Sequence, residues 1–288
     1  MTIAVIGATG RVGSEIVRGV LARGDAVTAL VRDPGKARSV FGEPGGLHIR
    51  ATRLDDPRDL TEALDGIRAV FIAMGSIGIE GVLQRIAISA AAGIGSIEQV
   101  TRLSVLNASA GSLGINQRAH YSIDQFASAA AVPYSTIRPA IFSASLLEGA
   151  PQVRASRTWT GLAGSGRMAL IDHRDAAEAG LRVLTNPALW GAHHDLTGPV
   201  LLSWPQALEL LSAELGEPVT FQVAAERQFL QRLTGAGVPA GTAELLITRE
   251  WAILAGENDY TTGTFQQITG HPPRPVAEFL HHYRAEFL

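Results

Sequence analysis

A glycine-rich turn near the start of the chain constrains the fold more than any other feature. Gly7 ends the apolar run 2–7, and Gly10 stands in the turn that follows. Gly13 lies near the start of the amphipathic pattern 11–24. The first glycine permits a tight turn, the second lets backbone approach a pyrophosphate, and the third lets the helix pack closely on the strand. The free N–H groups at a helix start also attract phosphate. This strand, turn and helix therefore predict a dinucleotide-binding unit.

Predicted strands and helices alternate through the first half of the chain. Apolar runs rich in branched residues predict strands, and the amphipathic patterns between them predict helices. The strands are expected at 2–7, 26–32, 47–52, 68–74, 99–105 and 133–139, and the helices at 11–24, 56–66, 81–93 and about 117–131. Repeated units of this kind form a parallel sheet with helices on both faces. We therefore predict a Rossmann-type, doubly wound α/β fold.

The pattern changes after Pro139, where prolines and glycines separate mostly helical segments. A Gly/Ser-rich turn and a short strand are expected within 161–172, and helices are expected at 174–185, 204–215, 226–234, 240–256 and 275–286. We divide the chain into a cofactor-binding domain, residues 1–150, and a smaller, mostly helical substrate lobe, residues 151–288. The two are expected to be interleaved, with returning strands near 168–171 and 193–197.

The end of the second predicted strand distinguishes NAD from NADP. An NAD site carries Asp or Glu there, about 20 residues after the glycine loop, to bind the ribose hydroxyls. Arg32 stands at that place, Lys36 and Arg38 follow it, and Arg11 lies inside the loop. Guanidinium groups suit a 2′-phosphate, so these cations predict NADP(H); the alternative is that they are solvated surface charges. The contacts predicted for this part of the cofactor are Gly7, Thr9, Gly10, Arg11, Val12, Gly13, Arg32, Lys36 and Arg38.

Composition limits the classes of partner. The net charge of −3 argues against a nucleic-acid partner, which normally leaves a basic footprint. The absence of cysteine excludes thiolate metal sites and cysteine nucleophiles, and His193, His194 and Asp195 lack a further metal ligand in view. No apolar run approaches the roughly 20 residues that span a bilayer, and the start lacks the basic region of a signal peptide. We expect a cytoplasmic monomer or dimer without a metal or a membrane partner.

Motifs across nearly the whole chain resemble one family. They are GATGRVG (7–13), LVRDPGKA (30–37), LDDP (54–57), VTRLSVLNA (100–108), AHYSIDQF (119–126), VPYSTIRPAIF (132–142), IDHRDAAEAGLRVL (171–184) and DLTGPVLLS (195–203). With these motifs the chain resembles the NmrA-like, atypical short-chain dehydrogenases/reductases, which bind NAD(P)H. Members include quinone, azo-dye and triphenylmethane reductases, natural-product ketone reductases, and regulators that bind the cofactor without turning it over.

The resemblance implies further contacts with the cofactor. It places Leu54 and Asp55 near the adenine, Ala73, Met74 and Gly75 beside the ribose and pyrophosphate, Ser104 near the nicotinamide, and Pro139, Ala140, Ile141 and Phe142 at the nicotinamide side of the substrate cleft. The predicted substrate pocket contains Ile77, Tyr121, Phe142, Leu146 and Trp159. Apolar residues of such a lobe can equally be plain core.

The usual proton donor of short-chain dehydrogenases is missing. Their Tyr-x-x-x-Lys pair lets a tyrosine protonate the carbonyl, whereas Gln125 stands four residues after Tyr121 here. The equivalent segment has His120 and Asp124, one helical turn apart on the same face. Ser104 or His120 could donate to a developing oxyanion; the alternative is a packing role for both.

These observations favour an NADPH-dependent reductase of a hydrophobic, aromatic ketone or quinone-like carbonyl. A ketoreductase that tailors a polyketide-type product would fit the missing Tyr–Lys pair. The alternative is a redox-sensing regulator that binds NADP(H) without turnover. An isomerase or epimerase with bound NAD is disfavoured by the arginine after the second strand.

Overall fold

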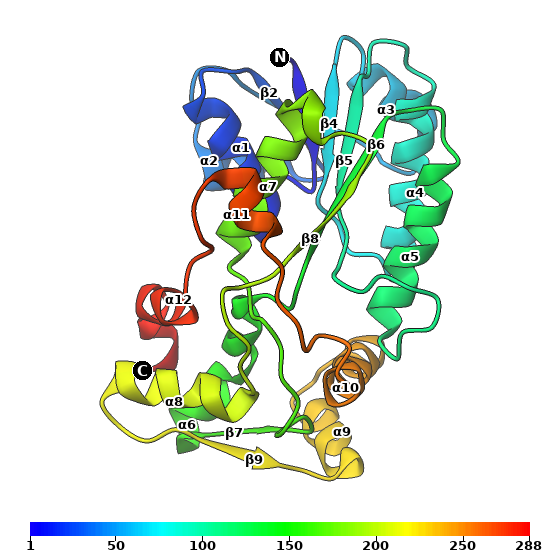
Figure 1. The fold of residues 1–288 in the computed structure, drawn as a ribbon. Coiled ribbons are helices and arrows are strands. Elements are labelled where there is room, and N and C mark those ends of the chain that lie inside the picture. Colours follow the sequence, from blue (N-terminus) through cyan, green and yellow to red (C-terminus); the bar gives the residue numbers. More distant parts are fainter.

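The computed structural model describes residues 1–288 and contains a parallel sheet between two layers of helices (Figure 1). The sheet has seven strands in the order β3-β2-β1-β4-β5-β6-β8. Their bounds are β1 (Ile3–Ile6), β2 (Val27–Val31), β3 (Leu47–Ala51), β4 (Ala69–Ile72), β5 (Gln99–Leu103), β6 (Tyr134–Pro139) and β8 (His193–Leu196). The strand order reverses between β1 and β4, and open α/β sheets bind ligands at the carboxyl ends of strands beside such a switch point. The predicted doubly wound fold is confirmed.

Both faces of the sheet are buried. Ile3 and Val5 join the core on one face, and Ala4 and Ile6 join the core on the other, because successive strand residues point in opposite directions. The first face is covered by α1 (Arg11–Ala22), α2 (Pro34–Phe41), α7 (His173–Thr185) and α11 (Thr264–Thr269), and the second by α3 (Pro57–Ala63), α4 (Ile79–Ala92) and α5 (Ile115–Ser128). This double coverage explains why the strands are apolar almost without alternation.

A second lobe lies below the sheet in the view of Figure 1. Its elements are the 3₁₀ segment η1 (Ser143–Gly149), α6 (Ala150–Ser156), β7 (Thr158–Gly161), α8 (Trp204–Leu215), β9 (Thr220–Val223), α9 (Glu226–Gly235), α10 (Ala240–Leu254) and α12 (Val276–His282). The chain leaves this lobe to supply α7, β8 and α11 to the sheet and its helical layer. None of the helices is both long enough and apolar enough to cross a bilayer.

Short elements account for most differences from the sequence predictions. The structure adds α2, α6, α11, β7 and β9, which have no predicted counterpart. The start of α2 does carry a signal, since the Asp33 side chain accepts from the Lys36 N–H and Pro34 occupies the first turn. Residues 168–171 form isolated bridges rather than a strand. The strands β7 and β9 pair with each other, and the bridges at 168–171 pair with Phe142 and Leu202, so each depends on a partner distant in sequence.

Candidate cofactor and substrate site

Backbone packing at the end of β1 requires glycine at two positions. Gly7 has a φ of 79°, and a Cβ there would lie 2.1 Å from the carbonyl oxygen of Ala73. A Cβ on Gly13 would lie 2.2 Å from the carbonyl oxygen of Gly7. No side chain caps the amino end of α1, so the first N–H groups of this helix are open to an anion. The loop is thus a cradle that fits a pyrophosphate.

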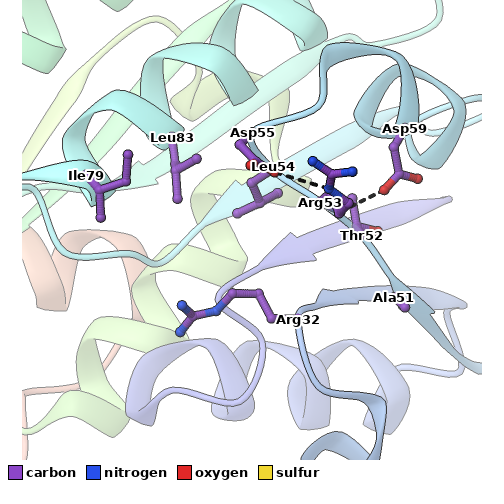
Figure 2. Close-up of a pocket in the computed structure, with 9 residues that line it drawn as sticks. All are labelled: Arg32, Ala51, Thr52, Arg53, Leu54, Asp55, Asp59, Ile79 and Leu83. Atoms are coloured by element: carbon purple, nitrogen blue, oxygen red, sulfur yellow. Dashed lines mark hydrogen bonds and ion pairs between the residues drawn. The ribbon is translucent and has the colours of Figure 1, made fainter.

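A cavity of about 530 Å³ lies at the carboxyl ends of β2 and β3 (Figure 2). Its lining is Arg32, Ala51, Thr52, Arg53, Leu54, Asp55, Asp59, Ile79 and Leu83. Asp59 accepts a hydrogen bond from the Arg53 N–H at 2.7 Å, and the Arg53 guanidinium pairs with Asp55 at 3.6 Å. Leu54 and Asp55, which the resemblance places near an adenine, therefore belong to this cavity. Apolar walls with polar groups at the rim are typical of a nucleoside site.

The four predicted phosphate-binding cations have different surroundings. Arg32 lines the cavity, is exposed, and forms no ion pair with the protein. Arg11 and Lys36 are also exposed and free of ion pairs. Arg38, by contrast, pairs with Glu43 at 3.6 Å and does not line the cavity. Arg32 is the cation that the fold presents most directly to a ligand.

A second cavity, of about 230 Å³, lies at the carboxyl ends of β5 and β6. The segment after β6 lines it with Pro139, Ala140, Ile141 and Phe142, which the resemblance places at the nicotinamide side of the cleft. The start of α5 lines it with Asn116 and Gln117, and the second lobe adds Leu245, Arg249 and Asn258. The two cavities thus lie at the same edge of the sheet, on opposite sides of β1 and β4.

A buried arginine connects β5 to α5 beneath this edge of the sheet. Arg102 of β5 is fully buried and forms an ion pair with Asp124 of α5. Tyr134 donates to Asp124 at 2.8 Å, and Arg138 pairs with it at 3.0 Å. Burial alone would raise the pKa of Asp124, but the charge of Arg102 and these hydrogen bonds outweigh it and lower the pKa below 3.8. Asp124 is therefore ionised at neutral pH and has no proton to give.

Arg102 also connects α5 to the loop after β4. Its Nη1 donates to Oε1 of Gln84 at 3.1 Å, and Gln84 Nε2 donates to the carbonyl oxygens of Gly75 at 2.5 Å and Met74 at 3.4 Å. The resemblance places these last two residues beside the ribose and pyrophosphate. The buried network therefore fixes the backbone of a predicted cofactor-binding loop.

Contacts within this network distinguish the two candidate donors. Arg102 lies 2.9 Å from His120 Nδ1, and because a guanidinium can only donate, the ring proton must be on Nε2. His120 Nε2 has no hydrogen-bond partner, although the side chain is only 4% exposed and lines neither cavity. Ser104 is 1% exposed and donates its proton to Asp124 at 3.0 Å. His120 has a free donor, whereas Ser104 does not.

We expect His120 to stay neutral and protonated on Nε2 as the pH falls through about 6.5, the ordinary pKa of histidine. Burial, followed by the charge of Arg102, lowers its pKa well below 6.5. The unfolded chain therefore binds a proton that the native state does not, and this residue makes stability fall as the pH drops below about 6.5. Nitrogen NMR of the imidazole over this range measures both tautomer and charge; a folded protein whose His120 gains a proton near pH 6.5 would contradict the expectation.

Four residues predicted for the substrate pocket line neither cavity. Ile77 follows β4 and Tyr121 lies on α5, and both are half-buried. Leu146 and Trp159 are core residues of the second lobe, which corrects their expected place. Trp159 packs against Trp204 with ring centroids 4.8 Å apart, so its indole is committed to the core. Phe142 alone of the five lines the second cavity.

Sequence reasoning missed several polar residues of the site. Arg102 carried a signal, because a charge inside the apolar run 99–105 must find a buried partner. Gln84 lies within a helix with no comparable signal, and its role depends on Arg102. Arg249 and Asn258 come from distant parts of the second lobe, and only the fold brings them to the cavity.

Comparisons with known proteins agree with this geometry. The model of the NmrA-like family matches residues 1–263. An NAD(P)H azoreductase of Xenophilus azovorans is 31% identical over 99% of both chains, and quinone oxidoreductase 2 of Escherichia coli (strain K12) is 27% identical over 97% of this chain and 98% of its own. The crystal structure of NADPH-dependent quinone oxidoreductase from Escherichia coli, complexed with NADPH, superposes with a TM-score of 0.90 at 26% identity, covering 98% of this chain and 99% of that one. The chain belongs to the NmrA-like family.

Proposed function

We propose that this protein is an NADPH-dependent reductase of quinone-like and aromatic carbonyl compounds. The observation that carries the proposal is Arg32, a cation without an ion pair that lines the first cavity where an NAD site would place a carboxylate. The names of the azoreductase and quinone oxidoreductase relatives support the reaction class. In its narrower form the proposal is a ketoreductase that acts on a polyketide-type product. The cytoplasmic location and the division of the chain at residue 150 remain predictions.

The residues present fit an extended dinucleotide along the carboxyl edge of the sheet. The first cavity, with Leu54 and Asp55, would hold the adenosine, and Arg32 would hold its 2′-phosphate. The uncapped start of α1 would hold the pyrophosphate, and Arg11 would reach the 2′-phosphate from the glycine loop. The second cavity, with Pro139 and Ile141, would take the nicotinamide end and the acceptor.

The chemistry that the chain itself adds is a hydrogen bond to the acceptor. When bound, NADPH supplies the hydride. His120 Nε2–H is the donor that the network leaves free, and Arg102 holds its ring in the donating tautomer. A neutral imidazole is a weak acid, so it serves best where the acceptor oxygen takes negative charge easily, as in a quinone.

Arg32→Ala is expected to weaken NADPH binding by about 10- to 100-fold and to leave NADH binding nearly unchanged. A hydrogen bond to a charged group contributes about 1.5–3 kcal/mol, and only NADPH carries the 2′-phosphate. Titration of cofactor fluorescence measures both affinities. Arg38→Ala is the matched control, with a smaller expected effect because Arg38 pairs with Glu43. Equal losses of affinity for NADPH and NADH would show that Arg32 does not bind the 2′-phosphate.

Steady-state kinetics with a panel of acceptors tests the proposed function. NADPH and NADH are each supplied with quinones, azo dyes and aromatic ketones, and oxidation of the cofactor is followed. We expect turnover with NADPH and preference for the quinones. Tight NADPH binding without reduction of any acceptor would favour the regulator instead.

A further inference from the structure

The second cavity has a polar end that the proposed chemistry does not use. Asn258 lines this cavity and is 1% exposed, yet its Nδ2 has no hydrogen-bond partner. Arg249 lines the same cavity, and its Nε is also buried and unpaired. Buried polar groups in folded proteins almost always have partners, because an unpaired one costs about 1–3 kcal/mol. Two residues that line one cavity thus each carry an unpaired donor, and together they indicate a place for an acceptor atom from a ligand.

The chain holds Asn258 rigidly. The preceding residue, Glu257, accepts hydrogen bonds from the Ser112 hydroxyl at 2.5 Å and the Leu113 N–H at 2.8 Å. The following residue, Asp259, pairs with Arg167 at 3.0 Å. The backbone of Asn258 is therefore held from both sides. Such preorganisation is what a binding group needs to contribute to specificity.

The charges around Arg249 indicate which acceptor fits. Its guanidinium pairs with Glu148 through contacts of 2.9 and 3.0 Å, and with Glu250 at 3.4 Å. It also lies over the Trp204 ring, with its central carbon 5.7 Å from the ring centroid. Two carboxylates thus more than balance the positive charge, and the cavity offers N–H donors without net attraction for an anion. A neutral oxygen suits this place better than a carboxylate or a sulfonate.

We propose that Asn258 and Arg249 form a recognition site for an uncharged carbonyl oxygen of the acceptor, and that this site makes the cavity selective for neutral quinone-like molecules over anionic ones. The inference rests on the proposed function only for the identity of the molecule as an acceptor. The residues Phe142 and Leu245 give the same cavity apolar walls for the rings.

Equilibrium binding tests the proposal without turnover. Calorimetry of the NADP⁺ complex is carried out with naphthoquinone, with naphthalene, which has the same rings and no oxygen, and with naphthoquinone sulfonate. Asn258→Leu is expected to weaken naphthoquinone by about 10-fold and to leave naphthalene unchanged, since it removes the amide at similar volume. The native protein is expected to bind naphthoquinone at least about 10-fold more tightly than its sulfonate.

Two further variants keep the test decisive. Asn186→Leu changes an asparagine outside both cavities, whose Oδ1 accepts from the Ala188 N–H at 3.1 Å, and is expected to have little effect. Asn258→Asp keeps the shape and replaces the donor by a charge, so it should weaken naphthoquinone at least as much as Asn258→Leu. Retained NADPH affinity shows that each variant is folded.

The proposal is overturned if Asn258→Leu weakens naphthoquinone and naphthalene equally, if Asn186→Leu has the same effect, or if the sulfonate binds as tightly as the neutral quinone. Failure of the proposed function has a different signature. In that case no acceptor is reduced, while the differences in binding between the variants persist.

Discussion

Arg102→Met is expected to lower the free energy of unfolding by about 3–5 kcal/mol, because it removes one partner of a buried ion pair. Asp124 would keep its contact with Arg138 but would lose the guanidinium that is fully buried beside it. The hydroxyl of Tyr134 and the ring of His120 would lose a donor at the same time. Urea unfolding followed by circular dichroism measures the change.

An exposed pair provides the matched control for this variant. Arg68 and Glu98 form an ion pair at 2.5 Å, but their side chains are 54% and 41% exposed. Arg68→Met is therefore expected to cost less than about 1 kcal/mol. A similar small loss for Arg102→Met would show that the buried network does not support the site.

The effect of Arg102→Met should also depend on pH in a known direction. The native pKa of Asp124 lies below its ordinary value of 3.8, so the ion pair stabilises the protein fully above about pH 4. This contribution is lost as the pH falls through the lowered native pKa, because a protonated carboxyl no longer needs the cation. The stability difference between the native protein and the variant should therefore shrink below about pH 4.

His120→Ala is expected to reduce kcat for an aromatic ketone by about 100-fold or more, and for a quinone by less than about 10-fold. Removing one donor to a developing oxyanion typically costs a factor of about 10² to 10³. A quinone depends less on that donor because its oxygens accept negative charge readily. The KM for NADPH should change little, since the expected adenosine and phosphate contacts are elsewhere.

The matched control for this second prediction is Tyr121→Phe. Tyr121 is the neighbour of His120 on α5, is half-buried where His120 is buried, and like His120 lines neither cavity. Its hydroxyl would be the donor if a tyrosine acted as in other short-chain dehydrogenases. A larger loss of kcat in Tyr121→Phe than in His120→Ala would reverse the assignment.

The parts of the site that could be predicted are those with local sequence signals. The glycine loop needs only a strand, a turn and a helix in direct succession, so its place at the end of β1 follows from 2–24 alone. The place of Arg32 follows from the length of the first repeating unit. Pro139, Ile141 and Phe142, which line the second cavity, are implied by the family resemblance and not by a local signal.

The parts that could not be predicted depend on packing between distant segments. The sequence does not separate Ser104 from His120 as donors, because the distinction depends on the contacts of Arg102 with both residues, and the contact with His120 crosses from β5 to α5. The indole of Trp159 packs on Trp204, which is far away in the chain, so nothing local shows that it is core. Asn258 reaches the cavity only because the chain returns from the second lobe.

A single-turnover experiment tests the central claim most directly. The protein is mixed with one equivalent of NADPH, and naphthoquinone is added in a rapid-mixing instrument while NADPH absorbance is recorded. We predict that the bound NADPH is oxidised with formation of one equivalent of the hydroquinone, and that deuterium at the transferred position slows the decay. NADPH that stays bound and unoxidised, with naphthoquinone and with every other quinone or aromatic ketone tried, would contradict the account.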